Sequence, residues 1–134
     1  MERRLHPRYP ARWRVTLLCQ CHRDMQQRVF DGITSDVSLG GMCIYSSHNL
    51  CASREMETIL TIPSLHTGGT PHQLKIRVRA SHTVLVGELD AFRTGVQFLG
   101  MSEADRQCLQ HHLEVRFGCY AIGKYQPISD AVSA

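Results

Sequence analysis

Lysine is nearly absent from this sequence of 134 residues: it occurs twice, and arginine supplies the rest of the 15 basic residues. Arginine presents a planar fork of N–H donors that matches a phosphate or the edge of guanine, whereas lysine presents a compact point charge. The net charge of +3 is also too small to indicate binding by bulk attraction. The composition therefore favours geometric recognition of an anion.

Long apolar runs are absent as well, so we expect no membrane insertion, no secretory signal and a cytoplasmic protein. A chain of this length is sufficient for one hydrophobic core. We expect one domain over residues 1–118, which includes an N-terminal arm, and a C-terminal tail over residues 119–134.

Aromatic residues make up only 7% of the sequence. Proteins that bind single-stranded nucleic acid stack bases on exposed aromatic side chains, so the composition disfavours nucleic acid as a partner. The sequence also lacks a glycine-rich phosphate loop, paired catalytic carboxylates and a group that would orient a Cys–His pair. We therefore predict a binding protein and not an enzyme.

Six cysteines occur without a secretory signal, so we expect them to be reduced. Cys19 and Cys21 alternate with their neighbours on an expected strand and should face the interior; a C-x-C metal site is the alternative. Cys108 and His112 would share one face of a helix, but His111 would point elsewhere. We therefore predict no metal site and no cofactor.

Alternation of apolar and polar residues predicts six strands. In LKIRVRAS, for example, Leu74, Ile76, Val78 and Ala80 should point inward and the residues between them outward. Gly32 suggests a bulge or bend in the second strand. Short turns and the lack of intervening helices predict an all-β fold, a six-stranded antiparallel barrel. The expected strands are 13–21, 28–38, 42–46, 56–64, 74–81 and 92–100.

The period changes after the last strand, where the sequence predicts one C-terminal helix. SEAD fits a capping box with Ser102 as the N-cap and Asp105 three residues on. Leu109, Leu113 and Phe117 follow at four-residue spacing and form a narrow apolar stripe. Such a helix suits the surface or one end of the barrel.

Arginines crowd the N-terminus at Arg3, Arg4 and Arg8, where Pro7 and Pro10 oppose a continuous helix. We expect a flexible arm that orders over an anionic ligand on binding. A solvated basic tail is the alternative for these arginines taken alone.

DVSLGG places Asp36 and Ser38 two positions apart on an expected strand, where they should share a face, and Gly40 and Gly41 allow close approach. An ionised aspartate accepts hydrogen bonds, and guanine N1 and N2 are adjacent donors. Arginine complements guanine O6 and N7 or binds phosphate. The motifs together predict a site for a guanine nucleotide; a local turn organised by the aspartate and serine is the alternative.

The pair Arg4-x-x-x-Arg8 and Asp36-x-Ser38-x-x-Gly41, with this strand pattern and terminal helix, resembles the PilZ domain family over residues 3–117. The resemblance implies a barrel that binds the bacterial second messenger cyclic di-GMP. It also implies that Arg4 and Arg8 hold phosphates and guanine Hoogsteen edges. Asp36 and Ser38 would then bond a guanine, with space kept beside it by Gly41.

Arg3 completes an R-R-x-x-x-R form, which in this family accompanies an intercalated pair of cyclic di-GMP molecules, so we expect two ligands per domain. Arg77 and Arg79 should form the solvated face of a strand, with a border of the ligand or partner site as the alternative. We expect a signalling adaptor with an unidentified protein partner, either monomeric or dimerising with ligand. The alternatives are a family member that assembles proteins without nucleotide and a small barrel that binds nucleic acid.

Overall fold

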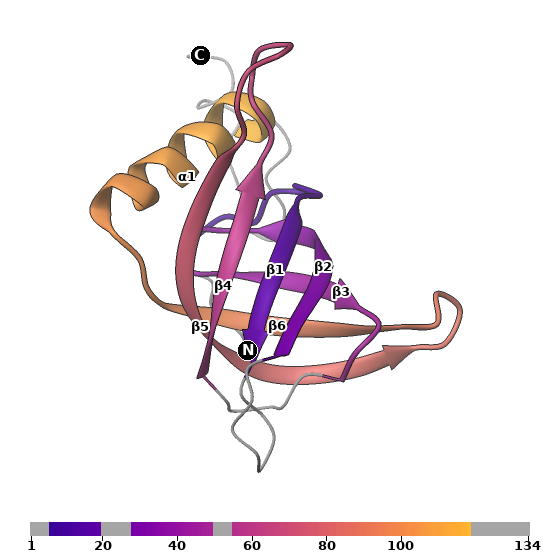
Figure 1. Cartoon of the computed structure of the whole chain (residues 1–134). Coiled ribbons are helices and arrows are strands. Elements are labelled where there is room, and N and C mark those ends of the chain that lie inside the picture. Colours follow the sequence, from indigo (N-terminus) through magenta and orange to yellow (C-terminus); the bar gives the residue numbers. More distant parts are fainter. Residues whose placement is uncertain (1–5, 20–27, 50–54, 119–134) are drawn as a thin grey trace.

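The computed structural model describes residues 6–19, 28–49 and 55–118. These residues form six strands followed by one helix (Figure 1). The elements are β1 (Arg14–Cys19), β2 (Arg28–Val37), β3 (Gly41–Ser46), β4 (Glu55–Ile62), β5 (His72–Val86), β6 (Ala91–Gly100) and α1 (Glu103–Phe117).

The six strands close into a barrel in the order β1-β2-β3-β6-β5-β4, and every neighbouring pair is antiparallel. The predicted fold class is therefore confirmed. The barrel interior is filled by aliphatic side chains from all sides, as the alternation predicted. The fully buried ones in the strands include Val15, Leu17, Ile44, Leu60 and Ile76.

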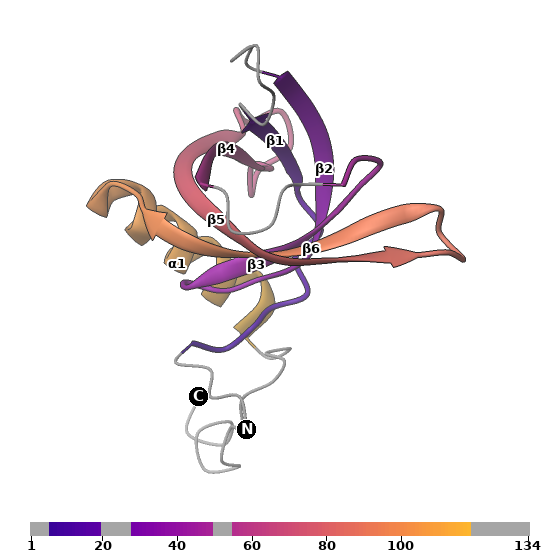
Figure 2. The same cartoon turned by 90° about the horizontal axis from the view of Figure 1, so that it is seen from below.

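β5 is longer than the alternation predicted, because it continues from Ala80 to Val86 and pairs with β6 as far as Ala91. This end of the β5–β6 hairpin extends beyond the closed part of the barrel (Figure 2). The consecutive apolar residues Val84 and Leu85 are 54% and 58% exposed there, so the strand has no buried face at this point. The period of two that marks a half-buried strand is lost in this stretch.

The irregularity in β2 lies between Thr34 and Asp36, not at Gly32 as expected. Gly32 is needed for another reason. A Cβ there would lie 2.7 Å from a side-chain carbon of Ile44 and 2.9 Å from the carbonyl oxygen of Tyr45. The register shift instead falls next to Asp36. The side chains of Cys19 and Cys21, which were expected to face the interior, lie outside the described residues.

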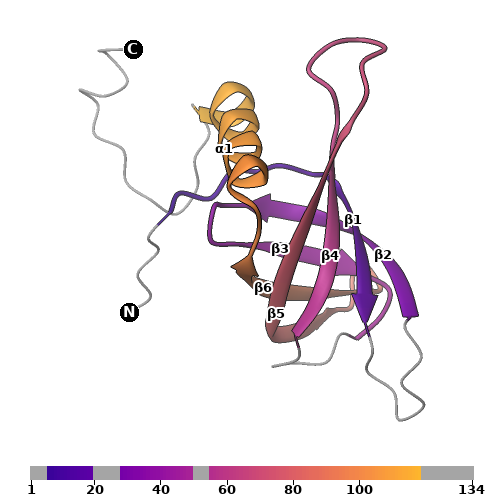
Figure 3. The ribbon, with the colours of Figure 1, turned by 60° about the vertical axis from the view of Figure 1, so that its left-hand side comes forward.

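Helix α1 begins and packs as predicted. The Ser102 hydroxyl accepts a hydrogen bond from the backbone N–H of Asp105 at 3.1 Å. Leu109 and Leu113 are buried in the barrel core, so the helix covers one end of the barrel (Figure 3). Its last residue, Phe117, packs on Trp13 with the ring centroids 5.9 Å apart.

Within the described residues, no helix has both the length and the apolar character needed to cross a membrane.

Candidate functional site

The segment before β1 runs along β2 and is tied to it by the backbone. Tyr9 and Val37 exchange two backbone hydrogen bonds of 2.9 Å. The Thr34 hydroxyl then accepts from the N–H of Trp13 at 2.9 Å and donates to the carbonyl of Ala11 at 2.6 Å. The chain from Tyr9 onward is therefore part of the barrel, and this fixes the position of the residue that precedes it.

That residue, Arg8, pairs with Asp36 at the end of β2. Its Nε lies 2.7 Å and its Nη2 2.5 Å from Asp36 Oδ1. Asp36 Oδ2 accepts a further hydrogen bond from the Ser35 hydroxyl at 3.0 Å. The two side chains are 22% and 13% exposed, so the pair is shielded but reachable. The structure thus joins the two sequence motifs through one ion pair.

The ion pair leaves ligand-binding capacity on both partners. It occupies two of the five N–H donors of the Arg8 guanidinium, so the other three lie outside the pair. Both contacts reach one carboxylate oxygen, and the other oxygen of Asp36 has a second lone pair beyond the bond from Ser35. A planar donor group and an anionic acceptor therefore stand side by side, which suits an anionic ligand that also carries N–H donors.

Ser38 organises the corner between β2 and β3. Its hydroxyl accepts from the N–H groups of Gly40 and Gly41, both at 3.1 Å, and donates to the Gly41 carbonyl at 3.2 Å. A serine hydroxyl has one donor and two acceptor positions, so all three are used inside this corner. The side chain is only 9% exposed. The turn that the sequence offered as an alternative for Ser38 is therefore present.

Both glycines of the corner lie against neighbouring parts of the chain. A Cβ on Gly41 would overlap the carbonyl oxygen of Val96, so β3 can approach β6 closely only with glycine here. A Cβ on Gly40 would lie 3.2 Å from a ring carbon of His6. The arm therefore passes over the corner, and the two motifs meet at His6 and Gly40 as well as at Arg8 and Asp36.

Arg93 on β6 is a cation near this site that sequence reasoning missed. Its Nε donates to the Cys43 sulfur at 3.1 Å across the β3–β6 pair. This hydrogen bond is the main cause that raises the pKa of Arg93, and the charge of Asp36 makes a smaller contribution. Arg93 sits in no motif, and only the register of β3 against β6 brings it here.

Of the remaining predicted site residues, only Arg77 and Arg79 are described, and both lie on β5. Arg3 and Arg4 lie outside the described residues. Arg79 on β5 pairs with Glu55 on β4, with Nη2 2.7 Å from Oε2 and both side chains about half exposed. Arg77 borders a separate shallow hollow together with Glu57 and Lys75. The suggestion that Arg77 and Arg79 border the ligand stays a prediction.

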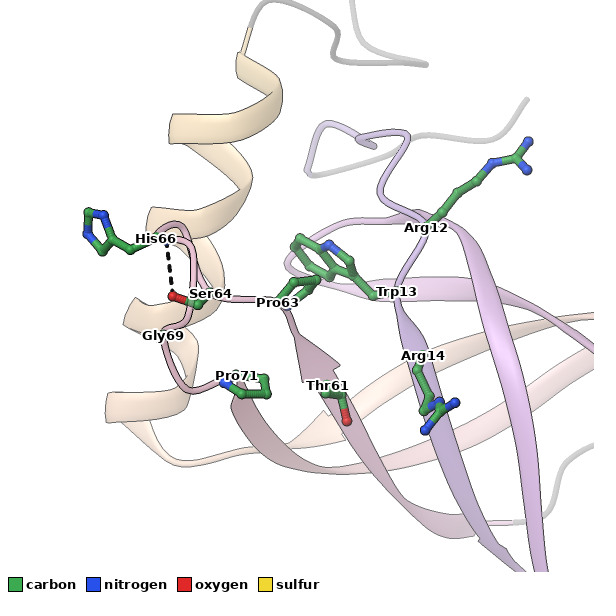
Figure 4. A pocket seen from close by; sticks show the side chains of 9 residues that line it. All are labelled: Arg12, Trp13, Arg14, Thr61, Pro63, Ser64, His66, Gly69 and Pro71. Atoms are coloured by element: carbon green, nitrogen blue, oxygen red, sulfur yellow. Dashed lines mark hydrogen bonds between the residues drawn. The ribbon is translucent and has the colours of Figure 1, made fainter.

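A larger hollow of about 390 Å³ opens elsewhere on the barrel (Figure 4). It lies between the start of β1, the end of β4 and the loop that follows β4. Its lining includes Arg12 and Arg14 but no carboxylate, so it lacks the paired donor and acceptor of the Arg8–Asp36 site. The lining residues are Arg12, Trp13, Arg14, Thr61, Pro63, Ser64, His66, Gly69 and Pro71.

Comparison with known proteins gives a family. The family model described as PilZ domain matches residues 2–114. No protein of curated function matches the chain.

Solved structures share the fold at low sequence identity. The Bacillus subtilis inhibitor of motility, MotI/DgrA, superposes with a TM-score of 0.67 at 14% identity over 87% of this chain and 51% of that one. The PilZ domain of Escherichia coli YcgR with c-di-GMP has a TM-score of 0.54 at 17% identity, over 81% of this chain and 87% of that one. The K. pneumonia MrkH–c-di-GMP complex has a TM-score of 0.59 at 18% identity, over 84% of this chain and 52% of that one. The chain thus spans about half the length of MotI/DgrA and of MrkH.

Proposed function

The chain belongs to the PilZ domain family, and from that premise we propose that it is a receptor for cyclic di-GMP that acts as a signalling adaptor. The observation that carries the proposal is the Arg8–Asp36 ion pair, because it unites the arginine motif of the arm with the aspartate motif of β2. Two of the similar structures are described as containing c-di-GMP, which supports the choice of ligand.

In this proposal the two partners of the ion pair contact different parts of the ligand. The N–H donors of Arg8 that lie outside the ion pair bind a phosphate or the O6 and N7 edge of a guanine. The acceptor position that Ser35 leaves on Asp36 takes one of the two donors, N1 and N2, of a guanine, and taking both requires a bond from Ser35 or Arg8 to be exchanged. Arg4 and Arg3 add further guanidinium groups from the arm, as the sequence motif predicts. Arg93, whose pKa is raised mainly by its hydrogen bond to Cys43 and to a small extent by the charge of Asp36, supplies further positive charge near Asp36.

The corner residues act mainly by shape. Ser38 uses its hydroxyl to hold the backbone of Gly40 and Gly41, so it fixes where Asp36 stands relative to β3. The direct bond from Ser38 to guanine that the family resemblance implies would require one of these bonds to be exchanged. Gly41 permits the approach of β3 to β6, and Gly40 keeps room under His6.

Signalling follows from the position of the arm. Arg8 is adjacent to Tyr9, where the chain joins the barrel. A ligand that contacts Arg8 would therefore also lie next to the residues that precede it. We propose that the ligand orders the segment with Arg3 and Arg4 around a pair of intercalated molecules. The new surface would then be read by a protein partner.

Calorimetric titration of the whole chain with cyclic di-GMP, with GTP as the control nucleotide, tests the proposal. We expect binding at micromolar or lower Kd, a stoichiometry near two and no comparable heat with GTP. A stoichiometry near one would support the receptor function and contradict the binding of two ligand molecules. No heat, together with an unchanged melting temperature, would contradict the receptor and favour a PilZ domain that assembles proteins without nucleotide.

A further inference from the structure

Three metal-binding side chains meet between the start of β5 and helix α1, away from the motifs of the nucleotide site. Cys108 and His112 are four residues apart and share one face of α1. His72 is the first residue of β5. One ligand atom from each of His72, Cys108 and His112 lies within 4.8 Å of the other two.

The distances suit a small cation held by mixed ligands. In a tetrahedral zinc site, the nitrogen and sulfur ligands stand about 3.5 Å from one another. The three atoms here need to move by only about 1 Å to reach that spacing, which side-chain rotation can provide. The rings of His72 and His112 are already neighbours, with their centroids 5.1 Å apart and their planes tilted by 58°.

A buried nitrogen of His112 is a second observation that points to a ligand at this cluster. The side chain is 4% exposed, and its Nδ1 is buried without a hydrogen-bond partner among the described residues. A buried polar atom of this kind costs free energy unless it is satisfied, and a bound ion is one way to satisfy it.

We propose that His72, Cys108 and His112 form a zinc site, with a water or another exogenous ligand in the fourth position. A thiolate with two imidazoles is a ligand set that favours Zn²⁺ over the hard cations Mg²⁺ and Ca²⁺. The sequence argued against a metal because His111 leaves the face of Cys108 and His112. The third ligand comes from β5 instead, 36 residues before Cys108.

A metal at this place would tie α1 to the barrel. Leu109 and Leu113 already anchor the helix through the core, on the same stretch of helix that carries Cys108 and His112. The metal adds a bond to His72, the residue at which β5 leaves the loop after β4. Since a ligand that binds only the folded state raises its stability, zinc should raise the melting temperature.

Cobalt substitution tests the site through its ligands. We would titrate the reduced, metal-free whole chain with Co²⁺ and record the absorption spectrum, then displace the Co²⁺ with Zn²⁺. We expect one equivalent to produce a thiolate-to-cobalt charge-transfer band and the visible bands of tetrahedral Co²⁺. Cys108→Ser should abolish the charge-transfer band. His72→Ala should weaken binding by about 10-fold to 100-fold, with His66→Ala, an exposed histidine of the loop after β4, unchanged.

Two results would overturn the proposal. One is a wild-type chain that shows no cobalt spectrum and no zinc-dependent rise in melting temperature. The other is a thiolate band that persists at full strength in Cys108→Ser, because the metal would then be held by other cysteines. His72 is exposed, so its variant should fold even where the buried His112 cannot be replaced.

Discussion

Arg8 forms an ion pair with a single carboxylate oxygen of Asp36, with its Nε at 2.7 Å and its Nη2 at 2.5 Å from Oδ1. The two residues are 28 positions apart in the chain. Each side chain therefore restrains the other, and in the proposed receptor the two residues should act as a pair. This relationship has a measurable consequence.

Arg8→Ala and Asp36→Ala should each weaken cyclic di-GMP binding by about 10-fold to 100-fold, since each removes charge-assisted hydrogen bonds to the ligand and frees its partner. The double variant should lose much less than the product of the two single losses, because the residues act together. Calorimetry on the four proteins measures this coupling. Strictly multiplicative losses would show that the two side chains bind independently.

Ser38→Ala should destabilise the fold by about 1–2 kcal/mol, because it removes the acceptor for two backbone N–H groups and a donor to the Gly41 carbonyl. Urea unfolding followed by circular dichroism measures the loss. Ser47→Ala is the control, since among the described residues the partner of that exposed hydroxyl is the ring of its neighbour His48. Equal free energies of unfolding for the two variants would contradict the claim that Ser38 stabilises the corner between β2 and β3.

Gly41→Ala should be strongly destabilising, because its methyl group would overlap backbone of β6 at Val96, which cannot move as a flexible side chain can. Gly100→Ala, on the same sheet, meets nothing within 4 Å and should change the free energy of unfolding by less than about 0.5 kcal/mol. Thermal unfolding compares the two. A Gly41→Ala protein as stable as the Gly100→Ala control would contradict the close approach of β3 and β6.

Leu113→Ala should cost about 2–5 kcal/mol, because the residue is buried where α1 closes the barrel and its loss leaves a cavity. Val115→Ala on the exposed face of α1 should be nearly neutral. Chemical unfolding measures both. Similar small losses would mean that α1 does not contribute to the core.

Stability should fall at alkaline pH through Tyr9. Burial, and then the charge of Glu114, raises the pKa of the Tyr9 phenol above its ordinary value of 10.0. The unfolded chain therefore loses this proton at a lower pH than the folded chain. The contribution of the Tyr9 phenol to the free energy of unfolding is complete below about pH 10 and is lost as the pH rises through the pKa of the folded state. Urea unfolding at several pH values should show a steeper alkaline loss for wild type than for Tyr9→Phe. Parallel curves would contradict the shift.

Much of the fold could be predicted because its strands are half-buried. Leu74, Ile76, Val78 and Ala80 alternate with charged residues, and all four are buried as expected. The pattern fails where the physical cause of alternation is absent. Beyond Ala80, β5 leaves the closed barrel, so no interior selects the residues, and the extension of the strand was missed.

The contact between the two motifs agrees with the sequence-based grouping of their residues, while the ligand-binding roles of these residues stay predictions. The two motifs named Arg8 and Asp36, and the structure brings them into contact. Whether Ser38 faces the same way as Asp36 depends on the register shift between Thr34 and Asp36 and on the end of β2, which composition does not fix. Arg93 reaches the site only through the pairing of β3 with β6, between segments far apart in the chain.

The most direct test of the receptor is a calorimetric comparison of Arg8→Ala with Arg12→Ala. The two arginines lie four residues apart on the same segment, but Arg8 pairs with Asp36 whereas Arg12 is exposed and borders the separate hollow. The account predicts that Arg8→Ala weakens cyclic di-GMP binding by about 10-fold to 100-fold with an unchanged circular dichroism spectrum, while Arg12→Ala binds as wild type. Equal affinity of both variants and the wild type would contradict the assignment of the site to the Arg8–Asp36 pair.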